Sequence, residues 1–199
     1  MPRELRERQI LEIGERIFAR DGYQGASLEQ VAQEAGVTRQ YLNKLFGDKE
    51  GLYLACHARA REQLNTLLAQ GATVLPEEPR RADARRLLRA TATAYFTFVR
   101  DHGAGWDVLF GGGAAVAGPA AEEVVRLRFE TVRVLSLLIV HAAPKIAPAA
   151  AESYAHAMSG AGTQMAVWWR QTEDCPLEEI ADRFVTLFWE GLAPYATED

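Results

Sequence analysis

Six polar or cationic side chains occupy a seven-residue stretch near the N-terminus, namely Thr38, Arg39, Gln40, Tyr41, Asn43 and Lys44. Arginine forms paired hydrogen bonds with guanine, and glutamine and asparagine do so with adenine. Lysine neutralises phosphates, while threonine and tyrosine contact phosphates or thymine methyl groups. The composition of this stretch is therefore typical of a surface that reads double-stranded DNA.

Apolar residues in the same stretch place these side chains on one helix face. Leu42, Leu45 and Phe46 recur at i, i+3 and i+4, so we expect them to face a core. Thr38 can cap this helix, and a short turn containing Val37 separates it from another short helix. Two such helices form a helix-turn-helix, whose second helix enters the major groove. The alternative is an ordinary solvated helix face, but the apolar residue at the turn and the amides among the cations favour DNA.

Neighbouring elements have clear start and stop signals. A first helix should cover roughly residues 3–20 and end at Gly22. Ser27 and Gln30 have the spacing of a capping box for the second helix, and Asp48 should cap a fourth helix.

Lys49 lies in the first turn of that fourth helix, where a cation opposes the helix dipole. A DNA phosphate at this position would offset the cost. An exposed lysine without a role is an equally good interpretation.

These residues resemble the TetR-type (TetR/AcrR-like) one-component transcriptional regulators over roughly residues 9–56. The resemblance rests on Ile10, Phe18, Gly22-Tyr23, Ala26-Ser27-Leu28, Val31-Ala32, Ala35-Gly36-Val37, Phe46, Lys49-Glu50 and Leu52-Tyr53. It implies a three-helix DNA-binding head in residues 1–55 and a larger helical body in residues 56–199 that dimerises and encloses a small-molecule pocket. Together with the helix-face argument, it gives a DNA-contacting set of Ser27, Thr38, Arg39, Gln40, Tyr41, Asn43, Lys44 and Lys49.

Three residues depart from the family pattern. Asn43 stands where a tyrosine is usual, Tyr41 where a small residue is usual, and Gly14 where alanine is usual. Gly14 should loosen the first helix slightly, because glycine has a lower helix propensity than alanine.

The rest of the chain has helical periodicity throughout, so we expect an all-α fold. Helices are predicted near residues 82–100, 119–142, 148–171 and 176–194. A proline-containing linker should lie in residues 71–81. A glycine-rich stretch includes a short apolar piece, residues 106–110, and then three glycines, residues 111–113.

Apolar residues form two stripes on the last predicted helix, which suggests that one faces its own bundle and the other a partner copy. On the preceding predicted helix, the small residue Gly162 would let another helix approach closely. The expected homodimer interface comprises Met158, Gly162, Val185, Trp189 and Leu192. Complete burial within one chain is the alternative.

Aromatic residues are concentrated in the body, and ligand cavities are usually apolar with few polar groups. We therefore expect a small hydrophobic or aromatic effector beside Phe96, Trp106, Phe110, Phe129, Met165 and Trp168. Five arginines, Arg80, Arg81, Arg85, Arg86 and Arg89, lie among acidic residues and favour a solvated helix face over a site for an anionic partner.

Several classes of protein are disfavoured. A net charge of -5 argues against a generic nucleic-acid coat. The neighbours Cys56 and His57 cannot face each other on a helix, and no other nucleophile has a base at a credible spacing, so we expect no enzyme. We expect no cofactor, no metal and no membrane partner, and the absence of a signal sequence or apolar span predicts a cytoplasmic protein.

The sequence thus predicts a dimeric regulator, most often a repressor by the resemblance, that binds a palindromic operator and leaves it when a small molecule binds. The alternative is a helical ligand-binding or scaffold protein without DNA activity.

Overall fold

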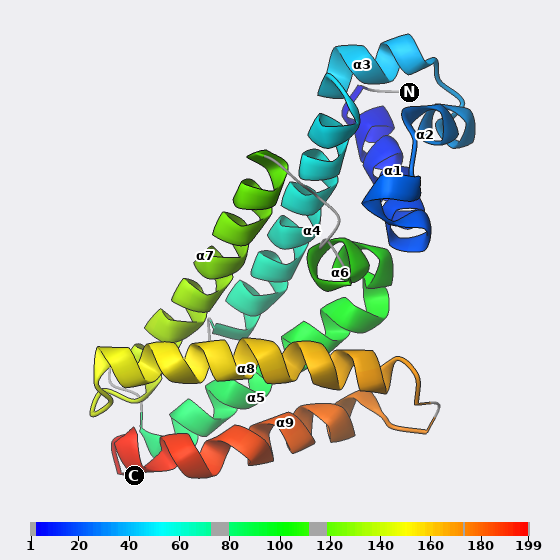
Figure 1. Cartoon of the computed structure of the whole chain (residues 1–199). Coiled ribbons are helices and arrows are strands. Elements are labelled where there is room, and N and C mark those ends of the chain that lie inside the picture. Colours follow the sequence, from blue (N-terminus) through cyan, green and yellow to red (C-terminus); the bar gives the residue numbers. More distant parts are fainter. Residues whose placement is uncertain (1–2, 73–79, 112–118, 173, 199) are drawn as a thin grey trace. The chain divides into compact units, whose positions relative to one another are not determined.

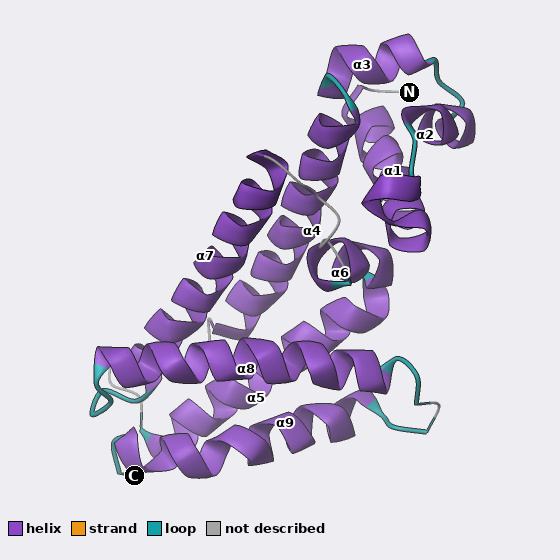
Figure 2. Ribbon diagram, viewed as in Figure 1, coloured by secondary structure: helices purple, strands orange, loops and turns teal. Residues whose placement is uncertain are grey.

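The computed structural model describes residues 3–72, 80–111, 119–172 and 174–198 (Figure 1). Within these ranges the secondary structure consists of nine α-helices and one short 3-10 helix, without a β-strand (Figure 2). The predicted all-α fold is confirmed. The helices are α1 (Arg3–Gly25), α2 (Leu28–Ala35), α3 (Arg39–Phe46), α4 (Lys49–Ala72), α5 (Arg81–Asp101), α6 (Gly103–Phe110), α7 (Pro119–Ala142), α8 (Pro148–Trp169) and α9 (Leu177–Leu192).

Most helix ends agree with their sequence signals. The backbone of α1 breaks at Gly22, which adopts φ 69°, a left-handed conformation suited to glycine. The piece expected only as a short apolar stretch is the helix α6. Residues 73–79 of the predicted linker and residues 112–113 of the glycine run lie outside the described residues.

Two compact units make up the chain. The head unit comprises residues 1–63 and 102–126, and the body unit comprises residues 64–101 and 127–199. The boundary predicted at residue 55 would leave α6 in the body, whereas the head unit contains α6 as well.

An apolar core lies in the described part of the head unit. Ile10, Ile17, Leu42 and Leu52 are fully buried in it, one or two from each of α1, α3 and α4. The Tyr53 hydroxyl donates to the backbone carbonyl oxygen of Val108 at 3.4 Å, which joins α6 to this core. The core therefore fixes α3 against α1 and α4.

In the body unit, α9 packs along α5, and α8 runs beside α9 (Figure 1). Phe96 is fully buried and meets the rings of Trp169 and Phe184 edge-on. The second half of α7 is apolar all round in sequence, yet Leu137 is 61% exposed, so this helix is not enclosed on every side within the protomer.

Candidate functional site

The turn between α2 and α3 has the geometry of a helix-turn-helix. The Ser27 hydroxyl accepts a hydrogen bond from the Gln30 backbone N–H at 3.2 Å, and Gln30 Oε1 accepts from the Ser27 backbone N–H at 2.8 Å. Gly36 ends α2 at φ 63°, and the Thr38 hydroxyl then accepts from the Tyr41 backbone N–H at 3.1 Å. The predicted caps are confirmed, and they set the direction in which α3 leaves the turn.

One face of α3 is polar and solvent-exposed. Leu42 is fully buried, and Leu45 and Phe46 pack partly buried against the head core. Tyr41 is half-buried and also packs against the core, at the margin of this face. The exposed side chains of the face are Thr38, Arg39, Gln40, Asn43 and Lys44. Cationic, amide and hydroxyl groups on a short, firmly seated helix are suited to reading base edges and contacting phosphates.

Arg39 is not unpaired on this face. Its guanidinium forms an ion pair with the Glu29 carboxylate of α2, and both side chains are more than half exposed. An exposed pair of this kind contributes only about 0–1 kcal/mol, so a DNA phosphate or base can compete for the arginine. Glu29 is not among the residues predicted from the sequence, although its position in the first turn of the bracing helix is readable there.

Lys49 is placed differently from the expectation. Its ammonium donates to the backbone carbonyl oxygens of Tyr23 at 2.9 Å and Ala26 at 3.2 Å, and lies 4.5 Å from the centroid of the Tyr23 ring. These contacts tie the start of α4 to the α1–α2 connection. These internal contacts are an additional role that neither expectation for Lys49 included, and its contact with a phosphate stays a prediction.

Ser27 is also engaged internally. Besides accepting from the Gln30 backbone, its hydroxyl lies 3.0 Å from Gln30 Oε1, to which it can donate. The hydroxyl therefore serves the cap of α2, and a phosphate at this helix end would meet backbone N–H groups first.

A buried ion pair braces the long helix of the head. Arg59 of α4 donates to Glu15 Oε2 of α1 at 2.7 Å and to Glu12 Oε1 at 2.8 Å. Burial raises the pKa of Glu15 more than Arg59 lowers it, and Glu15 Oε1 lacks a hydrogen-bond partner. Charged Glu15 is therefore held at an energetic cost.

Both parts of the chain match family models. Residues 10–56 match the bacterial regulatory proteins of the tetR family, and residues 84–191 match the tetracyclin repressor-like C-terminal domain. This chain belongs to the TetR family. It is thus a DNA-binding transcriptional regulator, and members of this family are regulators rather than enzymes.

Three similar proteins illustrate the relationship. This TetR-family chain is 30% identical over 110 residues to the transcriptional activator FasR of Mycolicibacterium smegmatis, covering 55% of the chain and 48% of FasR. It is 31% identical over 80 residues to the transcriptional repressor AcnR of Corynebacterium glutamicum, covering 38% of the chain and 43% of AcnR. The matches thus span about half the length of these curated relatives. A TetR-like regulator from Rhodococcus sp. RHA1 has a TM-score of 0.77 at 25% identity, covering 97% of this chain and 98% of that structure.

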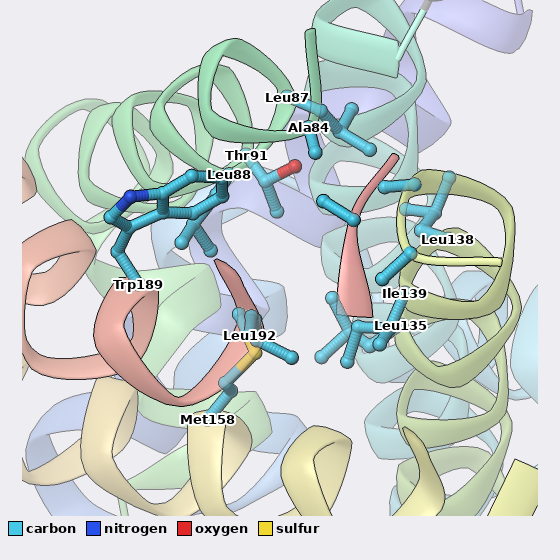
Figure 3. A pocket seen from close by; sticks show the side chains of 13 residues that line it. Ala84, Leu87, Leu88, Thr91, Leu135, Leu138, Ile139, Met158, Trp189 and Leu192 are labelled. Carbon is cyan, nitrogen blue, oxygen red and sulfur yellow. The ribbon is translucent and has the colours of Figure 1, made fainter. Parts of the chain in front are cut away.

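An apolar cavity lies in the body unit of this TetR-family chain. Its volume is about 40 Å³, and its wall consists of side chains from α5, α7, α8 and α9 together with Ala143 and Ala196. Figure 3 shows Trp189 and Leu88 on one side and Leu135, Leu138 and Ile139 on the other. Among the lining residues, Thr91 carries a hydroxyl and Trp189 an indole N–H, and the other side chains are apolar.

None of the six residues predicted to surround an effector lines this cavity, and their part in effector binding stays a prediction. Phe96 packs in the aromatic core, while Trp106 and Phe110 belong to the head unit. Phe129 is 58% exposed beside the His156 ring, and Trp168 is 45% exposed. Met165 is half-buried elsewhere on α8. Aromatic content alone did not distinguish a cavity wall from a packed core, whereas the aliphatic stripe of α7 was the usable signal.

The five predicted interface residues are also placed differently. Met158, Gly162, Val185 and Leu192 are buried within the protomer, and Trp189 is half-buried. Three of them, Met158, Trp189 and Leu192, line the apolar cavity. Their burial is in keeping with the alternative of complete burial within one chain, and the interface itself stays a prediction.

No described helix of this TetR-family chain is both long and apolar enough to cross a membrane. Among the described residues, acidic, histidine and cysteine side chains form no cluster of three suited to a metal ion.

Proposed function

We propose that this TetR-family regulator binds a two-fold symmetric operator as a homodimer, with α3 of each protomer in the major groove. The exposed polar face of α3, opposite the buried Leu42, is the observation that supports this assignment. Because DNA is the partner, the proposal places the protein in the cytoplasm.

Within that face we assign base contacts to Gln40, Asn43 and Arg39, whose amide and guanidinium groups match adenine and guanine edges. Lys44 and the hydroxyls of Thr38 and Tyr41 are assigned to phosphates. Ser27 and Lys49 act indirectly by holding the ends of α2 and α4.

The proposed dimer face is the outer side of α8 and α9. Trp168 is 45% exposed and Leu187 is 61% exposed, and the Arg183 guanidinium lies 5.4 Å from the Trp168 ring. Gly160 and Gln164 continue the exposed side of α8, and a Cβ added at Gly160 would meet nothing within 4 Å. This mixture of small and large apolar groups suits packing against the same helices of a second copy.

We further propose that the protein is a repressor and that a small molecule bound in the body unit weakens its operator binding. A ligand has this effect only if it binds the form that cannot bind DNA more tightly than the form that can. By linkage, DNA then weakens ligand binding by the same factor by which the ligand weakens DNA binding. The apolar cavity with the Thr91 hydroxyl supports a hydrophobic group on that ligand. One relative is an activator and another a repressor, so a reporter assay of the regulated promoter tests the sign.

Selection of operator sequences from a random double-stranded DNA pool at about 150 mM salt tests the DNA-binding proposal, because weak phosphate-only binding is suppressed there. We expect a two-fold symmetric motif. Gln40→Ala should relax base preference by about 1–3 kcal/mol at one position of each half-site, whereas Lys44→Ala should weaken all sequences alike. No enrichment by the folded protein would instead favour the ligand-binding or scaffold alternative.

A further inference from the structure

An arginine-lined groove lies against the apolar cavity in the body unit. The groove has a volume of about 730 Å³ and is lined on α5 by Arg81, Arg85, Arg86 and Arg89. Trp189 of α9 lines both the groove and the cavity. The register of α5 explains the arrangement, because Ala84 and Leu88 of the cavity wall alternate with the neighbouring arginines Arg85 and Arg89.

The groove has excess positive charge. Asp182 is the carboxylate in its wall and pairs with Arg89 at 2.7 Å, while Arg86 pairs with Asp83. Arg81 lies 5.9 Å from the Trp189 ring centroid. Within the described residues, neither Arg81 nor Arg85 has a carboxylate partner, so an anion can bind both without displacing an acidic group.

The shapes of the two spaces specify different parts of one ligand. The groove is within the roughly 300–1,000 Å³ of small-molecule sites, and guanidinium groups bind phosphates bidentately. A volume of about 40 Å³ in the apolar cavity admits only a few water-sized groups, since about 10–15 Å³ suffices for one. Such a space suits a short aliphatic chain rather than a long one or a ring system.

We infer that the body unit binds a small amphiphile, with a short aliphatic tail in the cavity and a head bearing two or more negative charges in the arginine groove. This inference rests on the ligand-binding part of the proposed function and names the chemical class of the effector. It also replaces the solvated-face interpretation of the arginine cluster by the anionic-partner alternative.

Calorimetric titration of the full chain tests this class with defined probes. Butyryl-coenzyme A carries both parts, coenzyme A only a polyanionic head, and butyrate only the tail with a single charge. We expect butyryl-coenzyme A to bind at least tenfold more tightly than either fragment, and palmitoyl-coenzyme A to bind more weakly than the short ester. Dihexanoyl-phosphatidic acid is a second probe, which carries a lipid phosphate head. If it binds more tightly than butyryl-coenzyme A, the natural head is assigned to a lipid, and if it binds more weakly, the head is assigned to a nucleotide.

Variants separate the two parts of the site. Arg81→Gln and Arg85→Gln should each weaken butyryl-coenzyme A binding at least fivefold, whereas Arg133→Gln, an exposed arginine of α7 outside the groove, should not. Ala84→Leu should fill the cavity and weaken the ester while leaving coenzyme A binding unchanged, with thermal unfolding as the check on folding.

The inference is overturned if no amphiphile binds, or if the groove variants bind as tightly as Arg133→Gln. Operator binding is measured separately on the same proteins. Ligand binding without operator binding therefore contradicts the proposed function alone, and operator binding without ligand binding contradicts this inference alone.

Discussion

The ammonium of Lys49 donates to the Tyr23 backbone carbonyl oxygen at 2.9 Å and lies 4.5 Å from the centroid of the same residue's ring. One side chain of α4 thereby fixes the segment that joins α1 to α2. This segment orients the bracing helix of the helix-turn-helix, so Lys49 supports the DNA-reading face without belonging to it.

Removal of this contact should reduce stability rather than phosphate binding. We expect Lys49→Met to lower the free energy of unfolding by about 2 kcal/mol, because hydrogen bonds from a charged donor contribute about 1.5–3 kcal/mol. Urea unfolding measures this, and Lys44→Met is the control. The control should keep its stability and lose about one unit of the salt slope of DNA binding. If Lys49→Met behaves like the control, Lys49 is a phosphate ligand after all.

Glu29 should restrain DNA binding through its ion pair with Arg39. Glu29→Gln releases the guanidinium and removes a negative charge near the phosphates, so we expect operator affinity to rise two- to fivefold, in keeping with an exposed pair of about 0–1 kcal/mol. Fluorescence anisotropy with labelled operator measures this. Glu34→Gln, on the same helix but close to Arg16 and Arg20, should change affinity less than twofold. Weaker binding by Glu29→Gln would contradict the assignment of Arg39 to DNA.

Gly14 is a packing requirement of the head core. A Cβ there would lie 2.9 Å from the Cys56 sulfur, so the clash in Gly14→Ala outweighs the gain of about 1 kcal/mol in helix propensity. We expect a net loss of about 1–2 kcal/mol in unfolding free energy. Cys56→Ala should reverse that loss in the double variant, a coupling that a double-mutant cycle detects. Additive effects of the two changes would show that Gly14 and Cys56 do not compete for space.

The pH dependence of stability should carry a contribution from Glu15, whose pKa is raised by burial. The folded state then favours protonated Glu15, so this contribution is present below the unfolded pKa and declines as pH rises through the folded pKa. Relative to wild type, Glu15→Gln should therefore become more stable as pH rises from about 4 to about 7.

Asp21→Asn is the control, because its stability relative to wild type should change with pH in the opposite direction. The hydrogen bond from Arg20 lowers the pKa of Asp21, so wild type should lose its advantage over this variant as pH falls. Urea unfolding at several pH values checks both trends. A Glu15→Gln difference that stays constant with pH would refute the role of burial.

Two leucines with equal exposure distinguish the proposed dimer face from the rest of the body surface. Leu187 on α9 and Leu137 on α7 are each 61% exposed. We expect Leu187→Glu to shift the protein to monomer in analytical ultracentrifugation, because it would bury a charge at an apolar contact. Leu137→Glu should leave the dimer intact. A monomeric wild type, or dissociation only by Leu137→Glu, would move the interface away from α8 and α9.

The sequence determined the helical organisation and the polar face of α3. Caps such as Ser27 with Gln30, and the spacing of Leu42, Leu45 and Phe46, act within a few residues, so they are readable without a fold. The same local signals gave the ends of most helices. The glycine-rich surroundings of α6 obscured that helix.

Only the tertiary structure decided which polar groups have partners and which helix faces are exposed to solvent. The partner of Arg39 lies on another helix, and the contacts of Lys49 are 23 and 26 residues away in sequence. Val185 and Leu187 of α9 are both apolar in sequence, yet Val185 is buried and Leu187 is exposed. Likewise, Trp189 came to line both the cavity and the arginine groove only through the packing of α9 on α5. Burial and pairing depend on which distant segments meet, and periodicity within one helix carries no information about its neighbours.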